Sequence, residues 1–299
     1  MISVVVNTWN EERNIKRCLE SVKDFADEMV VVDMESEDKT VEIAKKFGAK
    51  IFTHELTHYV EPARNFAVSK ASGDWVLILD ADEELPKSLV KRLNKVTKED
   101  KVDYVEIPRQ NIIFGQWMKH SRWWPDYNVR FFKRGRVKWS DKIHVSPKTL
   151  GKGLKLEEKE ENALVHYNYQ TISQYLERLN RYSTIQAENL LAGGYKFVWV
   201  DLIEKPVNEF LSRFFTGEGY KDGLHGLFLA TLQAFSEFIL YLKVWEKEEF
   251  VAQRDILPEF QRETKKAGQN LRFWQKQINY RESPFYKKPF LRLTNKIFR

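Results

Sequence analysis

The sequence has few of the residues that cross-link or anchor a chain. Cys18 is its single cysteine, which excludes an internal disulfide framework and favours a reducing, cytoplasmic setting. No stretch reaches about 18 uninterrupted apolar residues, the length that spans a membrane. The nearest stretch, Leu224 to Trp245, is interrupted by His225, Gln233, Glu237 and Lys243. No basic leader precedes the first apolar run, so we expect no cleaved secretory signal.

Apolar residues are plentiful enough for a sizeable core. They make up 42% of the 299 residues, and a chain of this length forms one large domain or two modest ones. The composition therefore allows a globular enzyme.

Positive charge gathers near the C-terminus. Eleven Lys or Arg lie between Arg262 and Arg299, against only Glu263 and Glu282, and aromatic residues are interleaved with them. Cations mixed with aromatic rings suit an anionic membrane surface. Nucleic acid is a rival partner, although we expect none to bind, and a solvated basic tail is the third interpretation.

The first hundred residues alternate between strands and helices. Apolar runs predict strands over residues 3–7, 29–32, 49–53 and 75–79. Asn10 is predicted to cap a helix with the apolar face Ile15, Cys18, Leu19 and Val22. Gly48 and Gly73 end the next two helices, and Pro62 begins the second of them. This alternation predicts a parallel sheet flanked by helices.

The pattern changes after Pro86. A helix to about residue 96 is followed by predicted strands over residues 104–107, 112–114, 129–132 and 163–167, which form a more antiparallel part of the sheet. From Ile172 onward the sequence is mainly helical. The predicted fold class is therefore α/β, a mixed and mainly parallel sheet with a mostly helical C-terminal region.

The segment WVLILDADEE, residues 75 to 84, carries the chemistry. Its apolar run indicates a strand buried on both faces, whose carboxyl end opens onto a ligand crevice. Asp80 and Asp82, two residues apart, point to the same side. A shared Mg²⁺ or Mn²⁺ would relieve their repulsion and could carry phosphates. Such pairs also occur by chance in acidic loops, but the buried strand favours a metal site.

These segments, in this order, resemble family 2 glycosyltransferases of the GT-A fold. SVVVNTWNEE resembles the family's opening, VVDMESEDKT its second strand and turn, and EPARNFAVSKASGDWVLILDADEE its Arg-Asn helix and DxD motif. Less specifically, WWPDYNVRFFKRG, KIHV and HYNYQTISQYLERLNRYS resemble bacterial members that build lipopolysaccharide core or related cell-envelope glycans.

The resemblance implies a division of the chain. Residues 1–170 would be the GT-A catalytic domain, with a nucleotide-sugar half (1–100) and an acceptor half (101–170). Residues 171–299 would form a helical, basic region that docks on a membrane.

The resemblance also implies roles for the donor side. Thr8, Asn10 and Glu11 would hold the base and ribose. Asp33 would reach the base, and Arg64 would approach the nucleotide. Asp80 would face the ribose or the metal, and Asp82 would coordinate the metal. Structural interpretations stay open for three of them. In the structural interpretation, Asn10 is only a cap, Glu11 only faces the helix dipole, and Arg64 is a surface residue. Because Asp33 ends an apolar strand, we expect it to be open to solvent on the cleft side.

On the acceptor side, the resemblance implies a general base and an aromatic groove. Asp126 is the first candidate for the base, with Glu83 and Glu84 as alternatives. His144 is either a further metal ligand and catalytic residue or a structural hydrogen-bonding residue. In the related envelope enzymes a glutamate usually follows this histidine, whereas this chain has Val145. Trp124, with Trp117 and Trp123, either stacks on a sugar or is buried under its loop.

The leading hypothesis is a metal-dependent, inverting glycosyltransferase. It would transfer a sugar from a nucleotide-diphosphate sugar, with a UDP-sugar expected first, to a cell-envelope glycan or lipid-linked acceptor at the inner face of the cell membrane. A nucleotidyltransferase is an alternative, although the NTWNEERN segment lacks the glycine-rich phosphate loop usual in that class. The second alternative is a basic protein that binds membranes or nucleic acid and uses the α/β part only as a scaffold.

Overall fold

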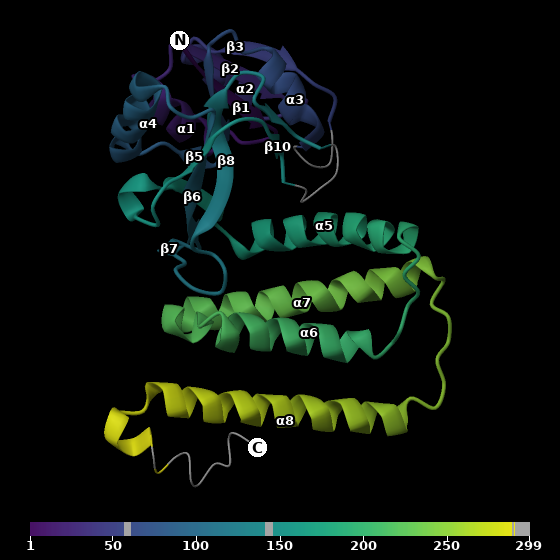
Figure 1. Ribbon diagram of the computed structural model, residues 1–299. Helices are drawn as coiled ribbons and strands as arrows, with labels where there is room; N and C mark the ends of the chain where they lie inside the picture. Colours follow the sequence, from purple (N-terminus) through teal and green to yellow (C-terminus); the bar gives the residue numbers. More distant parts are fainter. Residues whose placement is uncertain (57–60, 141–145, 289, 291–299) are drawn as a thin grey trace. The chain divides into compact units, whose positions relative to one another are not determined.

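The computed structural model describes residues 1–56, 61–140, 146–288 and 290. It consists of two compact units, whose helices and strands are labelled in Figure 1. The first contains Met1–Trp117 and Trp123–Gln170, and the second contains Met118–Arg122 and Thr171–Arg299. The second unit therefore includes a short piece, Met118–Arg122, that the predicted division assigns to the acceptor half.

The first unit is built on a mixed sheet whose N-terminal half is parallel. This half has the order β3-β2-β1-β4 and consists of β1 (Ile2–Thr8), β2 (Glu28–Asp33), β3 (Lys50–Thr53) and β4 (Trp75–Asp80). Valine runs at 4–6 and 30–32 are fully buried. Branched side chains favour strands here because they pack well on a pleated, covered surface.

The other half of the sheet is more antiparallel. Beyond β4 lie β8 (Asp126–Lys133), β6 (Tyr104–Ile113), β12 (Leu164–Tyr169) and β5 (Glu83–Glu84). Strand β8 is antiparallel to β4 and β6, whereas β12 is parallel to β6. The short strands are β7 (Gln116–Trp117) and β11 (Gly153–Lys155), which pair with β6, and the separate pair β9 (Val137–Lys138) and β10 (Lys148–Thr149). The predicted fold class is confirmed.

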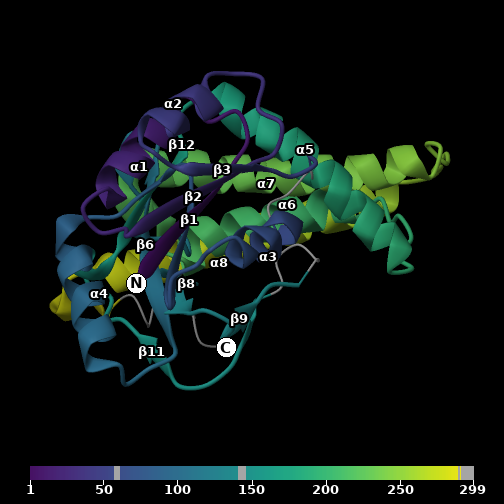
Figure 2. The same cartoon turned by 90° about the horizontal axis from the view of Figure 1, so that it is seen from above.

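Helices cover both faces of the parallel half. They are α1 (Ile15–Val22), α2 (Thr40–Lys46), α3 (Glu61–Ser69) and α4 (Lys87–Glu99). Because successive strand residues point to opposite faces, Val4 and Val6 pack in the core that includes α1, α2 and α4, whereas Val5 packs in the core that includes α3. Figure 2 shows α1 and α2 on one side of the strands and α3 on the other. The predicted apolar face of α1 is fully buried and thus confirmed.

Two details of the prediction are wrong. Helix α1 begins only after Asn14, and Asn10 has the left-handed φ of 52°, which asparagine tolerates better than most residues. Asn10 therefore caps no helix, and its side-chain oxygen accepts a hydrogen bond from the Glu37 N–H. The strands predicted on either side of Pro108 are one strand, β6, in which Pro108 lies opposite Tyr127.

The second unit is helical, as predicted from Ile172 onward. Its helices are α5 (Ile172–Ala192), α6 (Asp201–Leu211), α7 (Gly223–Lys247) and α8 (Leu257–Glu282), with short turns η2 (Ser212–Thr216), η3 (Gly219–Asp222) and η4 (Phe285–Lys287). Thr171 caps α5 by accepting a hydrogen bond from the Gln174 N–H. Helix α7 packs against both α5 and α6, and α6 packs against α8.

Helix α7, with the turn before it, changes the expectation that no segment is apolar enough to span a membrane. Gly219–Lys247 is long and apolar enough to cross a membrane by length and composition, with a mean hydropathy of 1.4 in its most apolar window and 28% of that window buried. Its polar residues interrupt the apolar run without removing this overall character.

Glu28 joins the first three strands at their amino ends. Its buried carboxylate accepts hydrogen bonds from Ser3 Oγ at 2.5 Å, Lys50 Nζ at 2.7 Å and the Ser72 N–H at 2.9 Å. Burial alone would raise its pKa, but Lys50, Ser3 and Ser72 outweigh burial and lower the pKa of Glu28 from 4.5 to about 2.

We predict that Glu28→Gln removes acid-sensitive stability. Because the folded-state pKa is the lower one, the stabilisation is present above the unfolded-state pKa and is lost as pH falls through about 2. A shift of this size corresponds to at most about 3 kcal/mol. Urea unfolding at neutral and acidic pH should show a smaller pH dependence in Glu28→Gln than in wild type. The control Glu99→Gln, on the surface of α4, should behave as wild type; an equal slope in all three proteins would contradict the prediction.

Candidate functional site

Three neighbouring strands bring predicted site residues to one edge of the sheet. In the register of the parallel half, Thr8 lies opposite Asp33 and Asn7 lies opposite Asp80. All four residues are at the carboxyl ends of their strands, where ligands bind in open α/β sheets. The strands therefore assemble Thr8, Asp33 and Asp80 from positions far apart in the sequence.

This edge contains buried polar atoms that lack hydrogen-bond partners among the described residues. They are both amide atoms of Asn7, Thr8 Oγ1 and Asp33 Oδ1. Asp33 Oδ2 accepts a hydrogen bond from the Ser36 N–H at 3.0 Å. Asp33 is only 4% exposed, so the expected solvent access is wrong. Each unsatisfied buried group costs about 1–3 kcal/mol, and a polar ligand at this edge would recover that cost.

Asn10 and Glu11 tie together the loops that follow β1 and β2. The Asn10 N–H donates to Ser36 Oγ at 2.8 Å, and the Glu11 N–H donates to Thr40 Oγ1 at 2.8 Å. Glu11 Oε2 accepts from Asn14 Nδ2 at 2.7 Å. Both residues therefore position the loops beside Thr8 and Asp33.

Asp80 is held by two arginines. Arg64 Nη2 lies 2.9 Å from Asp80 Oδ1, and Arg130 Nη2 lies 2.5 Å from Asp80 Oδ2. Burial would raise the pKa of Asp80, but Arg130 and Arg64 more than offset it and keep the pKa well below its usual range. Asp80 is thus ionised, and Arg64 is no surface residue, since its side chain is 12% exposed.

Arg130 is almost fully buried, with 1% of its side chain exposed. Its Nη2 also contacts Glu83 Oε1 at 2.7 Å, whereas its Nε and Nη1 have no hydrogen-bond partner among the described residues. Glu83 is fully buried and also accepts a hydrogen bond from the Asp80 N–H at 2.9 Å. Arg130 therefore bridges two carboxylates and keeps donors for a further anion.

A second arginine extends this network to Asp126. Arg109 Nη1 lies 3.3 Å from Glu83 Oε1, and Arg109 Nε donates to Asp126 Oδ2 at 2.9 Å. Burial would raise the pKa of Asp126, but Arg109 and Asn111 lower it overall. The Asp126 side chain is 29% exposed. It is therefore an ionised carboxylate within reach of solvent.

Asn111 and His166 close the network on the other side. Asn111 Nδ2 donates to Asp126 Oδ2 at 3.2 Å and to the Trp123 carbonyl at 2.8 Å. Both partners only accept, so the amide orientation is determined, and Asn111 Oδ1 must be the atom 2.6 Å from His166 Nδ1. His166 Nδ1 therefore carries a proton, and the other ring nitrogen, Nε2, lies 3.5 Å from Asp82 Oδ1.

The strand register explains this ring of contacts. Asp126 lies opposite Arg109, and His166 lies opposite both Asn111 and Glu83. The sequence analysis missed Arg109, Asn111, Arg130 and His166. A detectable signal was present for Arg130, a charged residue in the otherwise apolar run of residues 129–132.

The remaining predicted residues are less central. Trp124 is half-buried and packs edge-to-face on Trp117, with ring centroids 5.2 Å apart. His144 lies outside the described residues. Cys18 is fully buried, as predicted; burial, followed by the negative charges of Glu83, Asp82 and Asp80, raises the pKa of its thiol.

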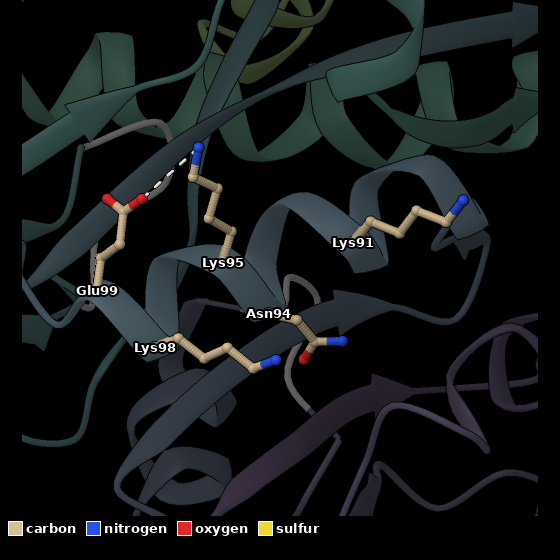
Figure 3. Close-up of a pocket in the computed structure, with 5 residues that line it drawn as sticks. All are labelled: Lys91, Asn94, Lys95, Lys98 and Glu99. Atoms are coloured by element: carbon tan, nitrogen blue, oxygen red, sulfur yellow. Dashed lines mark ion pairs between the residues drawn. The ribbon is translucent and has the colours of Figure 1, made fainter.

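A separate hollow lies on the surface of α4. Lys91, Asn94, Lys95, Lys98 and Glu99 line it, and Figure 3 shows the ion pair between Lys95 and Glu99, 3.7 Å apart. No predicted site residue lines this hollow, so we do not assign the chemistry to it.

Comparison with known proteins shows relatives along most of the chain. An uncharacterized glycosyltransferase of Rickettsia typhi is 31% identical over 258 residues, covering 82% of this chain and 87% of that protein. The lipopolysaccharide core biosynthesis glycosyltransferase LpsC of Rhizobium meliloti is 25% identical over 266 residues, covering 85% and 96%.

Solved structures give a weaker likeness. S. aureus TarS (residues 1–349) is 18% identical with a TM-score of 0.42, covering 95% of this chain and 92% of that chain. The family model for glycosyl transferase family 2 matches residues 3–184. The chain therefore belongs to glycosyl transferase family 2.

Proposed function

We propose that this glycosyltransferase is metal-dependent and inverting. In the proposal, it transfers a sugar from a nucleotide-diphosphate sugar, with a UDP-sugar as the first candidate, to a cell-envelope glycan or lipid-linked acceptor. The observation that carries the donor side is a group of buried polar atoms on Asn7, Thr8 and Asp33 that have no partner among the described residues and lie at the strand edge that includes Asp80. A nucleoside offers the complementary donors and acceptors, with Asp33 accepting from the base.

The residues beside Asp82 fit a divalent cation. Mg²⁺ is usually bound through one or two carboxylates together with substrate phosphates. In neutral His166 the proton is on Nδ1. Nε2 therefore directs its lone pair toward Asp82 Oδ1, which is 3.5 Å away. A cation beside these two electron-rich atoms would relieve their repulsion.

Asp82, with Asp80 and His166 beside it, would hold Mg²⁺ or Mn²⁺. When bound, the ion would neutralise the charge that develops on the departing diphosphate. The partnerless Nε and Nη1 of Arg130 are further donors suited to phosphate oxygens.

Asp126 is the best placed general base. Its Oδ2 accepts from Arg109 and Asn111, whereas Oδ1 has a single long contact, 3.2 Å, with Asn128 Nδ2. Oδ1 would take the proton of the acceptor hydroxyl. In a single displacement, the acceptor oxygen bonds to the anomeric carbon as the bond between that carbon and the diphosphate breaks. This inverts the anomeric configuration.

The alternative bases are less suitable. Glu83 is fully buried between Arg109 and Arg130. Glu84 is adjacent to it in β5 and therefore points to the opposite side. There it accepts a hydrogen bond from the Tyr167 hydroxyl at 3.0 Å.

Two observations favour an envelope acceptor at a membrane. LpsC, whose name assigns it to lipopolysaccharide core synthesis, aligns over most of both chains. The C-terminal region is rich in Lys, Arg and aromatic residues. A lipid-linked acceptor would be met at the inner face of the cell membrane, so the proposal includes peripheral association there.

We predict that Asp82→Asn lowers nucleotide-sugar turnover about 100-fold or more, since it removes a charge that stabilises the leaving group. Wild type should show a Mn²⁺-dependent rise in melting temperature with UDP, and Asp82→Asn should lose that dependence. Asp100→Asn, a surface substitution after α4, is the control. Full turnover by Asp82→Asn with added Mn²⁺ would refute the metal assignment.

For the general base, we predict that Asp126→Asn reduces kcat by about 10²–10⁴-fold while nucleotide-sugar binding persists. Binding and turnover should be measured on the same preparation, with melting temperature as a check on folding. Glu84→Gln is the matched control and should stay active. If Glu84→Gln is inactive and Asp126→Asn is not, Glu84 is the base.

The pH profile gives an independent test. Arg109 lowers the pKa of Asp126, and the base works only when ionised. We therefore predict that Arg109→Met moves the acid limb of kcat/KM to higher pH, because the Asp126 pKa rises when the guanidinium is removed. An acid limb that stays in place, in a folded variant, would show that Asp126 does not control it.

A further inference from the structure

Helix α7 directs polar side chains into the second unit. Gln233 Nε2 donates to the Tyr175 hydroxyl of α5 at 2.9 Å, and Arg213 Nη2 donates to Gln233 Oε1 at 3.1 Å. Lys243 Nζ donates to Asn180 Oδ1 of α5 at 2.7 Å. Two of the polar residues that interrupt the apolar run, Gln233 and Lys243, therefore join α7 to its neighbours.

Four large apolar side chains in the first part of α7 are exposed, whereas Leu229 is buried. Leu224 is 62% exposed, Leu227 38%, Phe228 54% and Phe235 43%. Their spacing of three, four and seven residues places them on one face of the helix. A helix on the surface of a water-soluble protein normally has the opposite arrangement, with its apolar face inward.

A second exposed apolar group lies at the same end of the unit. Phe285, Tyr286 and Phe290 follow α8 and are 88%, 75% and 68% exposed. The Tyr220 hydroxyl, just before α7, donates to Glu282 Oε1, at the end of α8, at 2.8 Å. Figure 1 shows the start of α7 and the end of α8 on the same side of the helical unit.

Cations accompany these apolar groups. Lys221 precedes α7, and Arg281, Lys287 and Lys288 lie at the end of α8 and in the turn after it, against Glu218, Asp222 and Glu282. Lys287 Nζ lies 5.9 Å from the Tyr286 ring centroid, and Lys288 Nζ lies 5.6 Å from that of Tyr280. Lysine beside aromatic rings is typical of the boundary between lipid headgroups and acyl chains.

We infer that this surface binds an anionic lipid bilayer. We call it the lipid-facing end and define it by Leu224, Leu227, Phe228, Phe235, Phe285, Tyr286 and Phe290. The apolar residues would enter the interfacial layer, and the lysines would meet anionic headgroups. A second protein chain is a poorer fit, because lysine is depleted at protein interfaces. The inference rests on the proposed membrane association and assigns it to named residues.

The first test measures the apolar contribution by co-sedimentation of the full chain with vesicles of phosphatidylcholine and phosphatidylglycerol. We expect Leu224→Gln/Phe228→Gln to lower the partition coefficient about tenfold or more. The matched control is Leu150→Gln/Phe250→Gln, whose side chains are 61% and 56% exposed elsewhere. The control should bind as wild type, and melting temperatures should be the same in all three proteins.

The second test measures the charge contribution. Lys287→Gln/Lys288→Gln should weaken binding about fivefold per lysine, and only to vesicles that contain phosphatidylglycerol. Lys91→Gln/Lys98→Gln, on the α4 hollow of Figure 3, makes the same charge change elsewhere and should have little effect.

These outcomes decide the inference. Equal binding by wild type and Leu224→Gln/Phe228→Gln would overturn it, as would a dimer in light scattering that this variant abolishes. The vesicles contain no sugar acceptor, so their binding is independent of transfer. Nucleotide-sugar hydrolysis in solution should be unchanged in the variants; its absence from wild type would count against the proposed function and not against the lipid-facing end.

Discussion

The site depends on one buried guanidinium. Arg130 lies between Asp80 and Glu83 with almost none of its surface exposed. An unpaired charge at that depth would cost several kcal/mol, so the arginine is tolerated only where both carboxylates meet it. This requires β8 to pair with β4 and β6 in the observed register. The join between the parallel and antiparallel halves of the sheet is thus held in place by charge as well as by backbone hydrogen bonds.

The two sides of the site differ in how their polar groups are satisfied. Around Asp126 and Glu83, charged groups pair with one another, although Arg130 Nε and Nη1 have no hydrogen-bond partner among the described residues. At the ends of β1 and β2, polar atoms of Asn7, Thr8 and Asp33 lack partners among the described residues. In the proposed function, a largely paired acceptor side would stand next to a donor side that gains hydrogen bonds when a ligand binds.

The sequence predicted what depends on local pattern. Strand runs, the face of α1 and the Asp80-Asp82 pair follow from periodicity and from the family resemblance. Partners that depend on register could not be predicted, because Arg109, Asn111 and His166 meet only after β6, β8 and β12 align. Asn10 has the residue type of a helix cap, and a cap was predicted. Its side chain instead accepts a hydrogen bond from the Glu37 N–H in a distant loop. On α7, the sequence pattern alone does not show which apolar residues are buried, and the structure leaves Leu224, Phe228 and Phe235 exposed.

Asn111 has a consequence for the movement of protons. It is the only group in the contact chain from Asp126 to Asp82, by way of His166, that neither gains nor loses a proton in ordinary conditions. An amide in this position carries polarisation but blocks proton exchange between the carboxylate and the imidazole. In the proposed reaction, the proton that Asp126 takes up would therefore leave to solvent from its partly exposed carboxylate and would not pass along this chain of contacts.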